Sequence, residues 1–305
     1  MAASPSTDTR FSKVWSVPGK VFLLGEYAVL AGAPALVAAV PPRFRLSVSP
    51  FENSTETSFH PESPAGRWCR AHHASQSWHF EDPARGAGGF GASTAQFILA
   101  AATAGLPDWR ALWTEYRSLN HSLAGAPPSG ADLVAQRVGG VVEFHPGANP
   151  EVHQRGSSLD SITIAVIQAS LQPGRKTATH SHLLAITPTM LERLRGELQP
   201  LLDRALPAFV RGDAASFGAS LGLYADILSK FDLEIGPARS DRDAIAAFPG
   251  VLGAKGTGAL QSDALIAVVD PTRLDIEAFR AFLAGRDLRL WCEQLDLQSG
   301  LEAIG

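Results

Sequence analysis

The feature that most constrains this 305-residue chain is the stretch GGFGASTAQFILAAATAG, residues 88–105. Three glycines in its first four positions free the backbone to turn and to expose amides, and an Ala-rich apolar run follows at once. That run predicts a helix with a Ser/Thr start and a closing Gly105. Because first-turn amides and the helix dipole attract anions, the stretch predicts either a plain capped helix or a phosphate-binding loop.

The neighbouring hydroxyls leave both interpretations open. Ser93 and Thr94 could cap the helix, bind a phosphate oxygen or reach a bound Mg²⁺. The stretch lacks the Gly-Lys-Ser/Thr of a P-loop and the G-x-G-x-x-G spacing of a dinucleotide-binding turn. It therefore belongs to neither of those two nucleotide-binding classes.

Composition indicates a protein that acts on small molecules. A hydrophobic content of 45% over 305 residues is enough for a large core and for two domains of about 150 residues. The net charge of −4 provides no broad attraction to nucleic acid or to an anionic membrane. Cys69 and Cys292 suggest neither a disulfide framework nor a zinc site. No apolar run approaches the roughly 20 residues of a membrane span, so we expect a cytoplasmic protein.

The order of predicted elements indicates an α+β protein. The opening segment alternates short apolar runs and is expected to be mostly sheet, whereas residues 50–87 predict turns without a regular element. SITIAVIQAS, residues 161–170, predicts a strand that begins a second domain. We therefore divide the chain into residues 1–160 and 161–305. Apolar residues at helical spacing, or capping residues, predict helices at 187–210, 214–233, 240–248 and 275–287. We expect a strand at 264–270 and a further helix at about 109–123.

Three more glycine-containing segments carry residues suited to chemistry. In VPGKVFLLGEYAVL (17–30), Lys20 is either a charge fixed in a cleft or an ordinary solvated lysine, and Glu26 is a candidate for an ion pair. In PPSGADLVAQRVGG (127–140), Asp132 is either a group that accepts or positions a substrate proton or a helix N-cap. In GVLGAKGTGALQSDALIAVV (250–269), the glycines allow a close approach to a ligand, or simply form a connection.

These four motifs, in this order, resemble those of the GHMP kinases, which include galactokinase, homoserine kinase, mevalonate kinase and phosphomevalonate kinase. The resemblance spans about Val17 to Val269. It implies the two-domain α+β GHMP kinase fold, with a ribosomal-protein-like N-terminal domain, a ferredoxin-like C-terminal domain and the active site between them. GEYAVL, the His121–Asp132 segment and GRKTATHSHL (174–183) are more like phosphomevalonate kinases than mevalonate kinases.

The resemblance implies transfer of a phosphoryl group from ATP·Mg²⁺ to phosphomevalonate or, as an alternative, to mevalonate. It also implies a homodimer, since dimers are common in these relatives. Arg137, Arg175 and Lys176 are further candidates to meet the charge of the acceptor. The implied roles are catalytic for Asp132 and Lys20; ATP-binding for Gly88, Gly89, Gly91, Ala92, Ser93 and Thr94; Mg²⁺-binding for Ser93; and substrate-binding for Glu26, Tyr27, Ser129, Gly130, Lys255, Gly256, Thr257 and Gly258.

Departures from the family pattern suggest other functions. Ala92 replaces the first of two usual serines, and Leu260, Gln261 and Ser262 replace a run of glycines. His121 falls opposite the Mg²⁺-binding glutamate of mevalonate kinases. A paralogue that binds a nucleotide or an isoprenoid precursor but phosphorylates weakly is therefore an alternative. Diphosphomevalonate decarboxylase shares the implied fold, but GKVFLLGEYAVL is more like the kinases.

Overall fold

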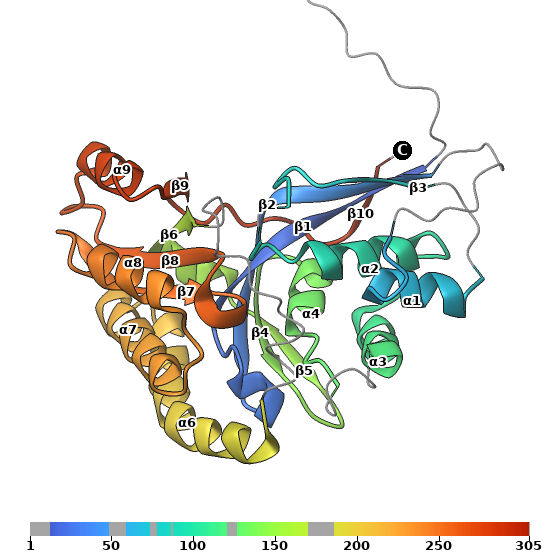
Figure 1. Cartoon of the computed structure of the whole chain (residues 1–305), viewed down its shortest axis with the longest axis horizontal. Helices are drawn as coiled ribbons and strands as arrows, with labels where there is room; N and C mark the ends of the chain where they lie inside the picture. The colour runs from blue at the N-terminus through green and yellow to red at the C-terminus, as the bar shows by residue number, and fades with distance from the viewer. Residues whose placement is uncertain are drawn as a thin grey trace, which may run out of the picture.

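The computed structural model describes residues 13–48, 59–73, 78–86, 88–120, 127–169 and 186–304. Helices pack on two antiparallel sheets, one built mostly from the first half of the chain and the other from the second (Figure 1). The predicted α+β class is confirmed.

The first sheet is built around two long strands, β1 (Lys13–Leu24) and β2 (Ala35–Val48), which place Lys20 opposite Ala39. The strand order is β10-β1-β2-β4-β5, and β3 also pairs with β2. A short 3₁₀ turn, η1 (Ala28–Ala31), connects β1 to β2. The remaining strands are β3 (Trp78–Glu81), β4 (Val141–His145), β5 (Glu151–Gln154) and β10 (Glu302–Ile304). The helices of this half are α1 (Pro64–Ala71), α2 (Ala92–Ala102), α3 (Trp109–Asn120) and α4 (Ala131–Val138).

The prediction of no regular element in residues 50–87 is wrong for α1 and β3. Ser63 caps α1 by accepting a hydrogen bond from the Gly66 amide, and Pro64 occupies the first helical position. Strand β3 pairs with β2 and buries Trp78 against Phe59. The cap was visible in the Ser-Pro pair, whereas a four-residue strand depends on pairing with a distant segment.

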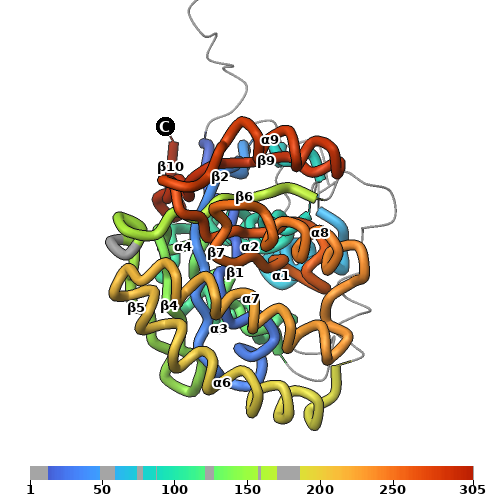
Figure 2. Tube along the Cα trace, turned by 90° about the vertical axis from the view of Figure 1, so that its left-hand side faces the viewer, coloured from blue at the N-terminus to red at the C-terminus, as the bar shows by residue number. Residues whose placement is uncertain are grey.

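The second sheet has the strand order β7-β8-β6-β9. Its strands are β6 (Thr163–Gln168), β7 (Val251–Thr257), β8 (Ala264–Val269) and β9 (Arg289–Cys292), and a 3₁₀ turn, η3 (Gly156–Asp160), precedes β6. Its helices are α6 (Pro188–Val210), α7 (Ala214–Lys230), α8 (Gly236–Ala246) and α9 (Ile276–Ala284). The chain order, strand, helices, two strands, helix, strand, is the ferredoxin-like arrangement. Figure 2 shows α7 between α6 and α8 on the near side of the molecule.

One hydrophobic core connects the two sheets. Successive residues of β6 point to opposite faces, so Val166 joins the core shared with β1, β2 and α2, whereas Ile167 joins a second core with α8 and α9. The shared core holds the motif-bearing elements of both halves in one packed unit. None of the helices in these described ranges is both long and apolar enough to cross a lipid bilayer.

Candidate active site

The glycine-rich stretch forms a turn that leads directly into α2. Gly89 and Gly91 have φ of 89° and 81°, a left-handed backbone that glycine adopts at low cost. Gly91 is the N-cap, and no side chain caps the helix. The expectation that Ser93 or Thr94 caps it is therefore wrong, because Gly91 supplies the turn by backbone alone. Exposed Ser93 and the first-turn amides are left available to an anion.

The end of α2 also differs from the prediction. The helix ends at Ala102 with Thr103 as C-cap in a right-handed conformation, and Gly105 lies beyond it. The Thr103 hydroxyl donates to the Ala100 carbonyl at 2.7 Å and closes the last turn. The difference in length affects only the end remote from the glycine turn.

Lys20 is held directly against this turn. Its Nζ donates to the Gly89 carbonyl at 3.0 Å and its amide to the Phe90 carbonyl at 3.0 Å, while its side chain is only 6% exposed. A Cβ at Gly91 would lie 3.0 Å from Lys20 Cγ, so the lysine occupies the space that the glycine leaves. Burial lowers the pKa of Lys20, and the charges of nearby carboxylates, Asp132 foremost, oppose that shift. Lys20 is thus a fixed cation rather than a solvated one.

Asp132 lies in the first turn of α4 and is not its N-cap. That position belongs to Gly130, with φ of 70°, whose missing Cβ leaves room for the Trp113 ring. The Asp132 Oδ1 accepts from the Leu133 amide at 3.0 Å, and Oδ2 accepts from the Thr94 hydroxyl at 2.7 Å. The N-cap interpretation of Asp132 is therefore wrong, because glycine again makes the turn. The carboxylate instead connects α4 to α2.

The third glycine segment lies beside the glycine turn. A Cβ at Gly88 would be 2.3 Å from the Asp263 carboxyl carbon, and a Cβ at Gly258 would be 3.8 Å from Gly89 Cα. Two loops about 170 residues apart in sequence thus approach each other closely, because Gly88 leaves room for the Asp263 side chain and Gly258 lies beside Gly89. The turn before α2, Lys20, Asp132 and the Gly258 loop form one cluster, which we call the glycine-turn site.

Glu26 and Lys255, both expected to bind substrate, form a buried ion pair with each other. The Lys255 ammonium also donates to the Gly256 carbonyl at 2.7 Å. Burial raises the pKa of Glu26 and lowers that of Lys255, while their mutual attraction opposes both shifts. The pair fastens the first motif to the third, and direct contact of either residue with substrate stays a prediction.

Two further hydrogen bonds join these motifs. Thr257 Oγ1 accepts from the Phe22 amide at 3.0 Å, and Tyr27 Oη accepts from the Leu260 amide at 2.7 Å. Ser129 shapes the turn before α4, because its carbonyl accepts from Trp113 Nε1 at 2.7 Å. Direct contact of Tyr27, Ser129 and Thr257 with substrate likewise stays a prediction.

Two non-glycine residues of the third motif have the left-handed backbone conformation that glycine favours. In η4 (Ala259–Gln261), Leu260 and Gln261 have φ of 52° and 56°. A left-handed conformation costs a residue with a Cβ about 1–2 kcal/mol. Gln261 is fully buried, and its Nε2 donates to the Gly258 carbonyl at 3.0 Å. The missing glycines thus leave strain in the loop but do not unwind it.

Sequence reasoning missed one contact and one residue. It named Thr94 for ATP, which stays a prediction, and did not foresee that the Thr94 hydroxyl donates to Asp132, 38 residues away. It did not single out Tyr116 of α3, which is buried close to Thr94 and near enough for the Asp132 charge to act on its pKa. No motif spacing signals either contact, because each depends on how α2, α3 and α4 pack.

Of the other predicted charges, the structure describes only Arg137. The Arg137 guanidinium donates to the Pro107 carbonyl at 2.9 Å. His121, Arg175 and Lys176 lie outside the described residues. Within the described ranges, no group of three His, Cys, Asp or Glu side chains is arranged to hold a metal ion.

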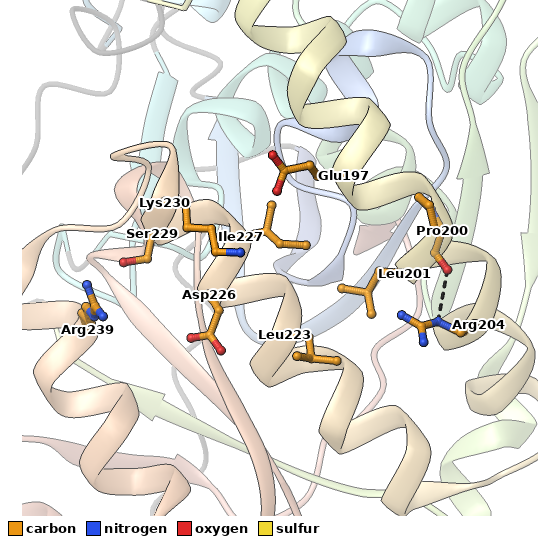
Figure 3. Close-up of a pocket in the computed structure, with 10 residues that line it drawn as sticks. All are labelled: Glu197, Pro200, Leu201, Arg204, Leu223, Asp226, Ile227, Ser229, Lys230 and Arg239. Carbon is orange, nitrogen blue, oxygen red and sulfur yellow. Dashed lines mark hydrogen bonds between the residues drawn. The ribbon is translucent and has the colours of Figure 1, made fainter.

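A separate groove lies on the helical side of the second sheet, between α6, α7 and the start of α8 (Figure 3). Exposed Leu223 lies beside charged residues of both signs, including Glu197, Asp226 and Arg204. The Arg204 Nε donates to the Pro200 carbonyl at 3.3 Å. None of the candidate catalytic residues lines this groove.

Comparisons with known proteins agree with this architecture. No protein-family profile and no curated protein matches the sequence. Among solved structures, mevalonate kinase of Methanococcus jannaschii superposes with a TM-score of 0.70 at 15% identity, covering 95% of this chain and all of that one. Galactokinase of Lactococcus lactis, complexed with galactose, gives 0.72 at 15% identity, covering 95% and 94%.

A third structure carries two ligands. Phosphomevalonate kinase of Streptococcus pneumoniae, in complex with phosphomevalonate and AMPPNP, superposes with a TM-score of 0.69 at 13% identity, covering 95% of this chain and 99% of that one. At such identities the likeness establishes the fold alone. The chain therefore has the fold of these small-molecule kinases, the GHMP kinase fold that its four motifs predict.

Proposed function

We propose that this protein is an ATP-dependent kinase that transfers the terminal phosphoryl group of ATP to a small molecule held against Asp132. The proposal is carried by the meeting of three groups in the glycine-turn site. These are the first turn of α2 without a side-chain cap, the Lys20 ammonium on the turn, and the Asp132 carboxylate fixed by Thr94. An anion-binding helix end, a cation and a carboxylate are what phosphoryl transfer requires of a protein.

The residues present fit the phosphates of a nucleotide. Gly88, Gly89 and Gly91 let the backbone approach closely, and a Cβ at Gly91 would press on Lys20. The Ala92 and Ser93 amides lie in the first turn of α2, where the helix dipole favours negative charge. ATP·Mg²⁺ supplies the phosphoryl group and neutralises part of its charge. Mg²⁺ commonly keeps waters and binds through substrate phosphates, and the Ser93 hydroxyl would be one protein neighbour of it.

The reaction forms one bond and breaks one. The acceptor oxygen bonds to the γ-phosphorus, the bond from that phosphorus to the β–γ bridging oxygen breaks, and ADP leaves. If the acceptor is an alcohol, Asp132 accepts the hydroxyl proton. If it is a phosphate monoester, already largely deprotonated at neutral pH, Asp132 orients it and Lys20 balances the charge.

We propose an acceptor from the mevalonate pathway, phosphomevalonate first and mevalonate second. The GEYAVL and SGAD segments support this order. The structural likeness to a mevalonate kinase and to a phosphomevalonate kinase supports both acceptors about equally. The loop at Leu260 and Gln261 favours a second candidate, a paralogue that binds nucleotide but transfers phosphate weakly, because side chains replace glycines beside the site.

Purified protein with ATP and Mg²⁺ is tested for ADP release against mevalonate, phosphomevalonate, diphosphomevalonate, homoserine and galactose. We expect release with one of the first two. Asp132→Asn should lower turnover by roughly 100-fold or more while ATP affinity stays within about twofold. Asp203→Asn on the exposed face of α6 is the matched control and should leave turnover unchanged.

Each negative result has a defined meaning. If no acceptor stimulates ADP release although ATP binds, the paralogue interpretation replaces the kinase. If the Asp132→Asn variant turns over normally, the role assigned to Asp132 is wrong even where the kinase activity is real.

A further inference from the structure

Both oxygens of the Asp132 carboxylate are engaged by the protein itself. The Leu133 amide holds Oδ1 at 3.0 Å within α4, and the Thr94 hydroxyl holds Oδ2 at 2.7 Å from the neighbouring helix α2. Thr94 is only 3% exposed, although it follows exposed Ser93 in the first turn of α2. The two helix ends that flank the site are thus connected by one short hydrogen bond to the carboxylate.

Hydrogen-bond chemistry fixes the direction of this contact. An ionised carboxylate can only accept, so the single hydroxyl proton of Thr94 is used on Asp132. The Tyr116 hydroxyl lies close enough for Thr94 and the Asp132 charge to affect its pKa. Burial, the largest influence, raises that pKa, so the phenol beside Thr94 stays neutral at neutral pH and adds no second anion to compete with Asp132 for the Thr94 proton.

Packing fixes Tyr116 beside Thr94. Tyr116 is 8% exposed, its ring meets Phe97 of α2 edge to face at 5.0 Å, and its carbonyl accepts from Asn120 Nδ2 at 2.7 Å. A buried tyrosine placed in this way has little freedom to leave Thr94. Thr94 is likewise fixed, because it lies within the first turn of a buried helix.

The arrangement keeps two opposite charges apart. Asp132 exerts the largest carboxylate influence on Lys20, yet the hydrogen bonds of these two described side chains go to other groups. Lys20 Nζ is bonded to the Gly89 carbonyl instead, and the Asp132 oxygens are bonded to Thr94 and Leu133. A direct ion pair would neutralise both groups and close the space between them.

We infer that Thr94, packed beside buried Tyr116, is a positioning residue that holds the Asp132 carboxylate apart from Lys20 and directs it at the acceptor. This inference rests on the proposed function, because it concerns the carboxylate that would orient the acceptor. The sequence suggested that Thr94 binds the nucleotide; on this inference Thr94 acts in turnover instead.

The kinetics of two Thr94 variants show whether Thr94 acts as a hydrogen-bond donor or only fills space. Thr94→Val keeps the shape and removes the hydroxyl, whereas Thr94→Ser keeps the hydroxyl and removes a methyl. We expect Thr94→Val to lower kcat roughly 10- to 100-fold, the range for a lost hydrogen bond to a charged group, with KM for ATP within about twofold. Thr94→Ser should stay within about threefold of the parent protein.

The control is Thr103→Val, which removes a hydroxyl from the other end of α2, where it bonds to the Ala100 carbonyl. It should leave kcat and KM unchanged. A merely structural role predicts the opposite order, with Thr94→Val closer to the parent protein than Thr94→Ser. That order, or normal turnover of Thr94→Val, overturns the inference.

A second measurement does not depend on turnover. Urea midpoints of Thr94→Val, Asp132→Asn and the double variant report whether the two side chains are coupled. We expect the double variant to shift by clearly less than the sum of the single shifts, and additive shifts overturn the inference. If no acceptor supports turnover in the parent protein, the kinase proposal fails, and the midpoints alone decide whether Thr94 holds Asp132.

Discussion

The buried ion pair between Glu26 and Lys255 predicts a large and pH-dependent loss of stability when the lysine is removed. The Lys255 side chain is 0% exposed and that of Glu26 is 5% exposed, so neither charge has access to bulk water. Lys255→Met keeps the length of the side chain but leaves the Glu26 carboxylate buried without its partner. Breaking a buried pair on one side costs about 3–5 kcal/mol.

The double variant Glu26→Leu/Lys255→Met removes both charges together. It should lie within about 2 kcal/mol of the parent protein, because apolar residues of similar size often replace a buried pair without loss. Lys230→Met, at the exposed end of α7, is the matched control and should change stability by less than about 0.5 kcal/mol.

The pH dependence follows from the pKa of Glu26. Burial already raises this pKa, and loss of Lys255 removes the attraction that opposes the shift. Between the unfolded and folded pKa values the folded state then binds more protons, so its stability falls as pH rises. The deficit of Lys255→Met should therefore be smaller at pH 5.5 than at pH 8.

Urea denaturation followed by tryptophan fluorescence measures these free energies of unfolding. A deficit below about 1 kcal/mol at pH 8, or an equal deficit at both pH values, would refute the reasoning. Either result would mean that water or another group reaches Glu26.

Three further outcomes are expected. Gly25→Ala should lower the free energy of unfolding, measured by heat or urea, by roughly 3 kcal/mol or more, because φ there is 98° and the new Cβ would lie 2.5 Å from backbone. Gly140→Ala is the control: its φ is 69° but the space around it is open, so it should cost only about 1 kcal/mol. Burial acts to raise the pKa of Glu143, but hydrogen bonds from Arg155 and a neighbouring histidine outweigh it and hold the pKa low. Arg155→Met should therefore lower stability by about 1 kcal/mol above pH 5, and its difference from the parent protein should shrink as pH falls toward 3 in acid titrations. Because burial lowers the pKa of Lys20, the lysine should lose its charge as pH rises from 7 toward 10, and ATP affinity measured by calorimetry should weaken over that range. The Lys20→Arg variant keeps its charge and should keep its affinity, so parallel pH curves for the two proteins would contradict this.

Local sequence indicated most of the helices and the strands β1, β2, β6 and β8. The glycines and the Ala-rich run specified the turn and helix around α2, and apolar spacing specified α6, α7, α9, β6 and β8. The order of four motifs predicted the fold through their resemblance to the GHMP kinases, and the solved structures agree with that fold. The same local rules predicted a capping hydroxyl for α2 and a capping carboxylate for α4, and both are wrong because Gly91 and Gly130 occupy those positions.

Contacts between distant segments were decided by the tertiary structure. Strand β10 has three exposed residues and no burial pattern, yet it pairs with β1, because Arg43 binds the carbonyls of Ser299 and Gly300 just before it. Leu260 keeps a left-handed backbone that its own side chain disfavours, because the Tyr27 hydroxyl accepts its amide hydrogen bond.

The chemistry of the candidate site shows the same division. The sequence identified Lys20, Asp132 and Thr94 as separate candidates on three segments. It could not show that Thr94 is bonded to Asp132 or that Glu26 is paired with Lys255, 229 residues apart. A hydrogen bond or an ion pair depends on separation in space to within a few tenths of an ångström, and packing of the two halves around their shared core sets that separation.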